Sequence, residues 1–198
     1  MLFREEAEFE LALRLRRAPG APLGEAFAFL SGLYFRGKLF YGLTFARPPR
    51  GVPGVLVITP NAGLLRADHP VTLATLRRFA RVDIDVDEPR YRRPLARDAR
   101  RLDEMAGSRT EIVLLGSIAT GKYVDLLLEV FGPRLLFPPD FVGRGDMSRG
   151  GLLLRCAREG RELSYASIGG AVRHGPRPPK LPPLRRSPGN SHSGESGR

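Results

Sequence analysis

Residues 112–123 are Ile112-Val113-Leu114-Leu115-Gly116-Ser117-Ile118-Ala119-Thr120-Gly121-Lys122-Tyr123, and their pattern indicates the fold class of the chain. The four apolar residues at its start are typical of a strand that is buried on both faces. A loop with two glycines follows, after which apolar residues recur at helical spacing as far as Phe131. This succession of strand, loop and helix predicts an α/β fold, in which helices pack on a sheet.

The rest of the chain alternates between the same two patterns. Continuous or alternating apolar runs predict strands at residues 9–15, 55–58, 82–87, 112–115, 135–137 and 163–167. Apolar residues at helical spacing predict helices at residues 25–34, 68–80, 95–106, 124–131 and 148–158. We therefore expect a single α/β domain over residues 1–173, with a mixed, largely buried sheet that is covered by helices.

Residues 174–198 differ in composition from the rest of the chain. They are rich in Pro, Gly, Ser and Arg and have no apolar periodicity. Such a segment cannot bury enough apolar surface to fold, so we expect a disordered C-terminal tail. Its proline run could instead bind a partner in a polyproline conformation.

Composition restricts the class of protein. The 198 residues include one cysteine, Cys156, which excludes a disulfide framework and a cysteine-based zinc site, and we expect no metal site. The sequence has no apolar run of transmembrane length, and its N-terminus lacks the apolar core of a signal peptide. We therefore expect a cytoplasmic protein without a membrane partner. No cofactor and no oligomeric state is indicated.

The chain is strongly basic, with a formal net charge of +11. Such a charge attracts phosphate polymers over long distances, although it is also compatible with a merely soluble, arginine-rich surface. Only three of the basic residues are lysines, and two of them, Lys38 and Lys122, directly follow a glycine. Because lysine is a compact charge whose pKa can fall on burial, we predict that one or both contact an anion or act in catalysis. The alternative is that these two lysines occur at their positions by chance.

The loop between Gly116 and Lys122 has the spacing G-x-x-x-x-G-K of a phosphate-binding loop. In such a loop, backbone amides at a helix N-terminus surround a phosphate, and the lysine adds charge. However, Tyr123 stands where a nucleotide hydrolase needs Ser or Thr to hold magnesium. We therefore predict an anion cradle, with a purely structural turn as the alternative. Its expected members are Gly116, Ser117, Thr120, Gly121 and Lys122.

A second glycine-rich loop covers residues 143–151 and precedes an apolar helical run. Its glycines allow close approach to a ligand, and Arg144 and Arg149 could bind phosphate beside Gly145. Asp146 is the best candidate for a catalytic carboxylate, with Lys122 as its charged partner. The alternative is a capped loop without a ligand.

Three short segments, taken in order, resemble the YaaA family of bacterial proteins, which is linked to peroxide stress and DNA binding. Residues 59–66, Thr59-Pro60-Asn61-Ala62-Gly63-Leu64-Leu65-Arg66, resemble its S-x-x-x-G-L-L-R-P segment. Residues 116–123 resemble its N-L-A-S-x-E-Y segment, with Lys122 in place of an acidic residue and Tyr123 kept. Residues 144–149 resemble its R-G-L-M-A-R helix start. The resemblance implies an α/β fold in which these segments converge on one cleft.

The expected cleft lies beyond the carboxyl ends of the strands, where ligands bind in α/β sheets. Its expected residues, besides those of the two loops, are Thr59, Asn61, Gly63, Lys38 and Tyr123. We hypothesise that this cleft binds or acts on a nucleic acid or nucleotide. One alternative is a glycosidase- or transferase-type enzyme that uses Asp146 and Lys122. Another is a non-catalytic interaction protein.

Overall fold

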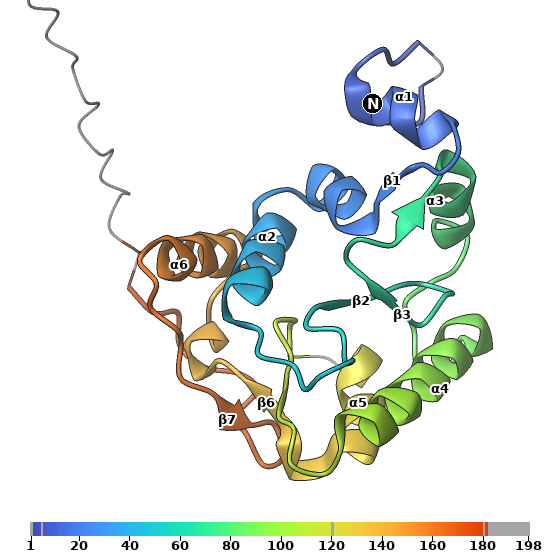
Figure 1. Cartoon of the computed structure of the whole chain (residues 1–198). Coiled ribbons are helices and arrows are strands. Elements are labelled where there is room, and N and C mark those ends of the chain that lie inside the picture. The colour runs from blue at the N-terminus through green and yellow to red at the C-terminus, as the bar shows by residue number, and fades with distance from the viewer. Residues whose placement is uncertain (1, 5, 120, 180, 182–198) are drawn as a thin grey trace, which may run out of the picture.

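The computed structural model describes residues 2–4, 6–119, 121–179 and 181. These residues form α-helices and small sheets, so the chain is a mixed α/β protein (Figure 1). None of the helices in these ranges is both long enough and apolar enough to cross a membrane.

The strands are short and do not join into one sheet. Strands β1 (Ala21–Pro22) and β4 (Pro70–Val71) form one antiparallel pair, and β2 (Leu56–Ile58) and β3 (Leu64–Arg66) form another. Strand β6 (Leu135–Phe137) lies parallel to β5 (Ile112–Val113) and antiparallel to β7 (Ala166–Ser167).

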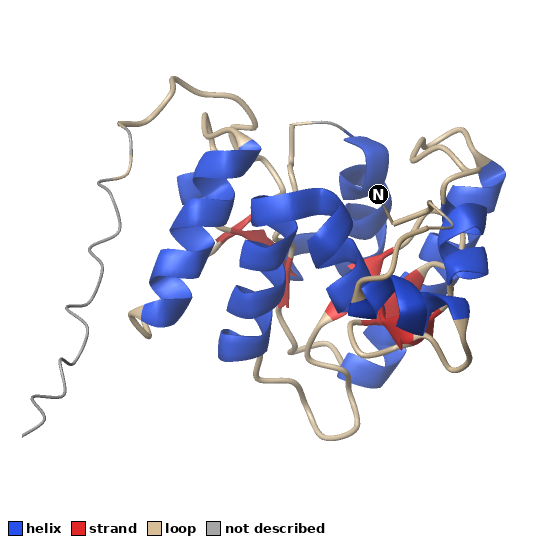
Figure 2. Cartoon of the chain, turned by 90° about the horizontal axis from the view of Figure 1, so that it is seen from above, coloured by secondary structure: helices blue, strands red, loops and turns tan. Residues whose placement is uncertain are grey.

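The expectation of one mixed sheet is therefore corrected to three small sheets, of which only the last is mixed. The physical reason is strand length, because the described strands have at most three residues and offer few ladder hydrogen bonds to a neighbour. Figure 2 shows the strands in separate places between the helices.

The first helix of the fold was not predicted from the sequence pattern. Residues 9–15 were expected to form a strand, but helix α1 covers Glu10–Arg16. Leu11, Ala12 and Leu15 are buried, which is the spacing of one helix face, whereas Phe9 and Leu13 are exposed. Helix α1 packs with α3 (Leu73–Phe79) and the start of α2 (Leu23–Phe45) around a common apolar cluster.

Helix α2 is longer than the helix expected at 25–34, and it bends at Gly32, where φ is 65° and ψ is −144°. Its second half packs closely on α6 (Asp146–Arg158), the helix expected near residues 148–158. A Cβ atom added to Gly37 would lie 2.7 Å from the carbonyl oxygen of Gly150. A Cβ atom added to Gly150 would lie 2.8 Å from the carbonyl oxygen of Leu33. Two facing glycines therefore allow the two helix backbones to touch.

Helices α4 (Pro89–Ala106) and α5 (Gly121–Phe131) pack together and against β5 and β6 in a further apolar cluster. Residues 82–87, expected to be a strand, instead form an irregular segment that ends in a turn before α4. In this turn the Asp87 amide donates to the Asp85 carboxylate at 2.9 Å. Short 3-10 helices, η1 (Gly132–Arg134) and η2 (Pro139–Phe141), flank β6.

The expected tail begins with residues that contact the folded part. The guanidinium of Arg144 donates to the carbonyl oxygen of Pro179 at 3.5 Å, and Leu181 packs against the α2–α6 cluster. Residues 180 and 182–198, which make up most of the expected disordered tail, lie outside the described residues.

Candidate functional site

A cavity of about 350 Å³, which we call the lysine cavity, lies where α2 meets the loop after β5 and the starts of α5 and α6. It brings together side chains that are far apart in the sequence, among them several from both glycine-rich loops. Its lining residues are Ser31, Tyr34, Phe35, Lys38, Ser117, Tyr123, Asp146 and Met147.

Lys38 supplies the positive charge of the lysine cavity. Its ammonium lies 4.4 Å from the ring centre of Tyr34 and 5.4 Å from that of Phe35, which are the residues four and three positions before it on α2. Burial lowers the pKa of the Lys38 ammonium, and the charge of Asp146 opposes this shift. Among the described residues, no carboxylate lies within ion-pair distance of Lys38.

Two tyrosines fasten the walls of the cavity to the loop after β5. The Tyr34 hydroxyl donates to the carbonyl oxygen of Leu115 at 3.1 Å, and the Tyr123 hydroxyl donates to that of Ser117 at 2.8 Å. Burial raises the pKa of both tyrosines, which keeps both hydroxyls protonated at neutral pH. A Cβ atom on Gly116 would lie 2.6 Å from the Tyr123 hydroxyl, so this position needs glycine for close packing.

The start of α6 forms the rim of the cavity. The Asp146 side chain is 70% exposed, and its carboxylate lies 3.5 Å from the guanidinium of Arg149. Arg149 is held in place because its Nε donates to the Phe141 carbonyl oxygen at 3.1 Å. Arg144 donates to the Asp140 carbonyl oxygen at 2.9 Å and to the Ser148 hydroxyl at 3.3 Å. Both arginines thus tie the glycine-rich loop to the residues before it and to the first turn of α6.

Lys122 occupies a different environment from Lys38. It lies in the first turn of α5 with an exposed side chain, and it is not among the residues that line the lysine cavity. Thr120, also expected in the anion cradle, lies outside the described residues. Gly121 faces the Asp125 side chain of its own helix, and Gly145 is the residue before α6. The lysine that enters the cavity is therefore Lys38.

The segment around Thr59 and Gly63 forms a tight turn rather than a wall of the lysine cavity. Thr59 is fully buried, and its hydroxyl donates to the Gly63 carbonyl oxygen at 2.9 Å and accepts from the Ala62 amide at 3.0 Å. Gly63 has a φ of +65° and packs against α4, where Asp98 accepts from the Leu64 amide at 3.1 Å. These contacts give Thr59 and Gly63 a structural role.

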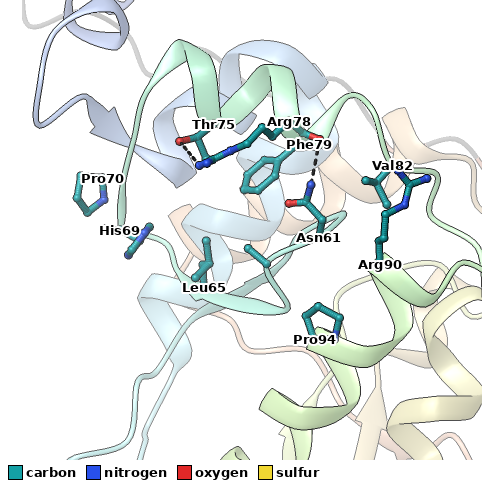
Figure 3. A pocket seen from close by; sticks show the side chains of 11 residues that line it. Asn61, Leu65, His69, Pro70, Thr75, Arg78, Phe79, Val82, Arg90 and Pro94 are labelled. Atoms are coloured by element: carbon teal, nitrogen blue, oxygen red, sulfur yellow. Dashed lines mark hydrogen bonds between the residues drawn. The ribbon is translucent and has the colours of Figure 1, made fainter.

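Asn61 lines a second and wider cavity of about 640 Å³ between α3 and α4 (Figure 3). Its side-chain amide donates to the Arg78 carbonyl oxygen at 3.0 Å, and the Arg78 guanidinium donates to the Thr75 hydroxyl at 3.3 Å. Arg78 from α3 and Arg90 from α4 give this cavity a basic lining. The expected cleft residues are thus divided between two cavities and a structural turn.

Sequence reasoning missed Ser31, Tyr34, Phe35 and Met147 as lining residues. The aromatic residues of α2 are equally typical of an apolar core, so composition alone does not single them out. The available signal was spacing, because Tyr34 and Phe35 lie four and three residues before Lys38 and therefore share its helix face.

Comparison with known proteins gives no match to the chain: no family model, no curated protein and no solved structure corresponds to it. The resemblance to the YaaA family therefore stays a prediction from short motifs.

Proposed function

We propose that the chain binds the phosphate of a nucleotide, free or at the end of a nucleic acid, in the lysine cavity. The observation that carries this proposal is the position of Lys38. Lys38 lines the cavity, and its ammonium has no ion-pair partner among the described residues, so a ligand anion can supply the missing charge. The motif resemblance to a DNA-binding family points toward the same class of ligand.

The walls of the cavity favour a ligand with a flat ring beside its phosphate. Tyr34 and Phe35 lie against Lys38, and aromatic side chains stack on nucleobases without strong sequence preference. The volume of about 350 Å³ falls near the lower end of the range of about 300–1,000 Å³ that is typical of small-molecule sites. A mononucleotide therefore suits this cavity better than a larger cofactor does.

The proposal is tested by calorimetric titration of the parent chain with adenosine monophosphate, adenosine and inorganic phosphate at low salt. Lys38→Met should weaken binding of the monophosphate by at least about tenfold, since a hydrogen bond to a charged group contributes about 1.5–3 kcal/mol. Adenosine should bind the parent and the variant alike, because it has no phosphate.

Lys122→Met is the matched control. It removes the same charge from the other Gly-Lys pair, but from an exposed side chain outside the cavity. We expect it to bind adenosine monophosphate as the parent does. Equal binding by the parent and by Lys38→Met, with both proteins folded, would refute the proposed function.

A further inference from the structure

The amine of Lys38 has surroundings that suit covalent chemistry as well as charge recognition. The amine lies against the rings of Tyr34 and Phe35, and Lys38 is one of the residues that line the cavity. A ligand atom that enters the cavity can therefore reach the amine. Desolvation of a lysine by apolar walls is a recognised way to activate it as a nucleophile.

The charged and titratable groups around Lys38 come from three helices. Tyr34 lies on its own helix α2, Tyr123 comes from α5, and Asp146 and Arg149 come from α6. Burial and Arg149 lower the pKa of the Lys38 ammonium, whereas Asp146 raises it. Burial has the larger effect, so Lys38 has more neutral amine at pH 7 than an ordinary exposed lysine has.

We propose that the Lys38 amine forms an imine with the carbonyl carbon of an aldehyde or ketone bound in the lysine cavity. This inference goes beyond the proposed function, because the neutral amine attacks a carbonyl, whereas the ammonium binds a phosphate. The two can therefore be tested separately.

The step is balanced without any oxidant or reductant. The nitrogen of Lys38 forms a bond to the carbonyl carbon, and its two protons leave with the carbonyl oxygen as one water molecule. The intermediate carbinolamine needs one proton delivered to its hydroxyl group and one removed from its nitrogen. Asp146 is the one carboxylate among the lining residues, and it stands at the exposed rim, where it can exchange protons with solvent.

The chain offers a sharp test, because it has only three lysines, Lys38, Lys122 and Lys180. The unmodified full chain is incubated at pH 7 with a low concentration of D-glyceraldehyde 3-phosphate and sodium cyanoborohydride, whose hydride reduces an imine to a stable amine. Peptide mass spectrometry then measures the rate of labelling at each lysine. We expect Lys38 to be labelled at least about tenfold faster than Lys122, because binding places the carbonyl beside the amine.

Two comparisons separate the inference from the proposed function. D-glyceraldehyde has the same carbonyl without the phosphate, and it should also label Lys38 faster than Lys122. Lys38→Arg has no lysine amine, so the fast labelling should disappear.

Labelling of Lys38 that is no faster than that of Lys122 would overturn the inference. If Lys38→Met still weakens binding of adenosine monophosphate in that case, the proposed function stands and only the imine is lost.

Discussion

At the scale of single residues, the lysine cavity depends on the contact between Gly37 and Gly150. This contact brings α2 against α6 and thereby places Lys38 near the start of α6, where Asp146 forms the rim. Any side chain at Gly37 would have to push the backbone of Gly150 away, because the nearest atoms belong to the main chain. The identity of Gly37 is therefore a requirement of the site as well as of the fold.

We predict that Gly37→Ala lowers the free energy of unfolding by about 1–3 kcal/mol, the usual cost of overpacking a close contact. It should also weaken binding of adenosine monophosphate, because α2 and α6 would move apart. Gly169→Ala is the control, since its added Cβ would lie 3.7 Å from the nearest side-chain atom, an ordinary contact. Urea unfolding measures both variants, and an equal stability of the two would contradict the packing argument.

At the scale of elements, the sequence patterns predicted the central strand–loop–helix unit and failed at the N-terminus. The apolar run at residues 112–115 and the spaced apolar residues of 124–131 correspond to β5 and α5. These elements were predictable because the apolar residues of both patterns pack in the core. Residues 9–15 alternate like a strand, yet they form α1 because tertiary burial selects Leu11, Ala12 and Leu15. Alternation of apolar and polar residues over so short a segment cannot distinguish a strand from a helix.

Only part of the candidate site could be predicted from the sequence. Lys38, Ser117, Tyr123 and Asp146 were all expected there, and all line the cavity. Lys122 was expected as well, but its side chain is exposed and it is not among the lining residues. The direction of Lys122 at the start of α5 depends on how this helix packs against α4, which the spacing of the Gly116–Lys122 loop does not specify.

A pH-dependent prediction belongs to the start of α4. Glu88 accepts hydrogen bonds from the backbone and side chain of Arg90, and these bonds lower its pKa from 4.5 to about 2. A depressed pKa stabilises the folded state above pH 4.5, and this stabilisation is lost as the pH falls toward about 2. Glu88→Gln should therefore unfold at a lower temperature than the parent at pH 6, and the difference should shrink toward pH 2.

Thermal unfolding from pH 2 to pH 6 measures this difference. Glu104→Gln is the matched control, because Glu104 is an exposed acid on the same helix that forms no ion pair with any described residue. A difference between parent and Glu88→Gln that stays constant over this range would contradict the capping role of Glu88.

At the scale of the whole molecule, the net charge of +11 is concentrated in part on the solvent face of α4. Glu88, just before α4, pairs with Arg90. Two acids of the helix are also paired, Asp98 with Arg97 and Asp103 with Arg134. The remaining exposed arginines of α4 have no ion pair with the described acids. These arginines are Arg92, Arg93, Arg100 and Arg101.

If the ligand of the chain is a nucleic acid, this face should bind its phosphates. Replacing these four arginines together with glutamine should reduce the slope of log affinity against log salt concentration by about three to four for duplex DNA. The same charge change at exposed Arg4, Arg17, Arg50 and Arg158 is the control, and it should alter the slope less. Fluorescence anisotropy across a salt series measures both variants, and equal slopes would show that the charge of α4 has no special role.

Binding of a nucleotide phosphate beside Lys38 can be measured by acetylating the lysines of the unmodified chain with and without saturating adenosine monophosphate. Peptide mass spectrometry gives the acetylation rate of Lys38 and of Lys122 in the same sample. We expect the nucleotide to slow acetylation of Lys38 at least about tenfold, since bound ligand covers the amine, and to leave the rate at Lys122 unchanged. An unchanged rate at Lys38 under saturating nucleotide, or protection of Lys122 instead, would contradict binding beside Lys38.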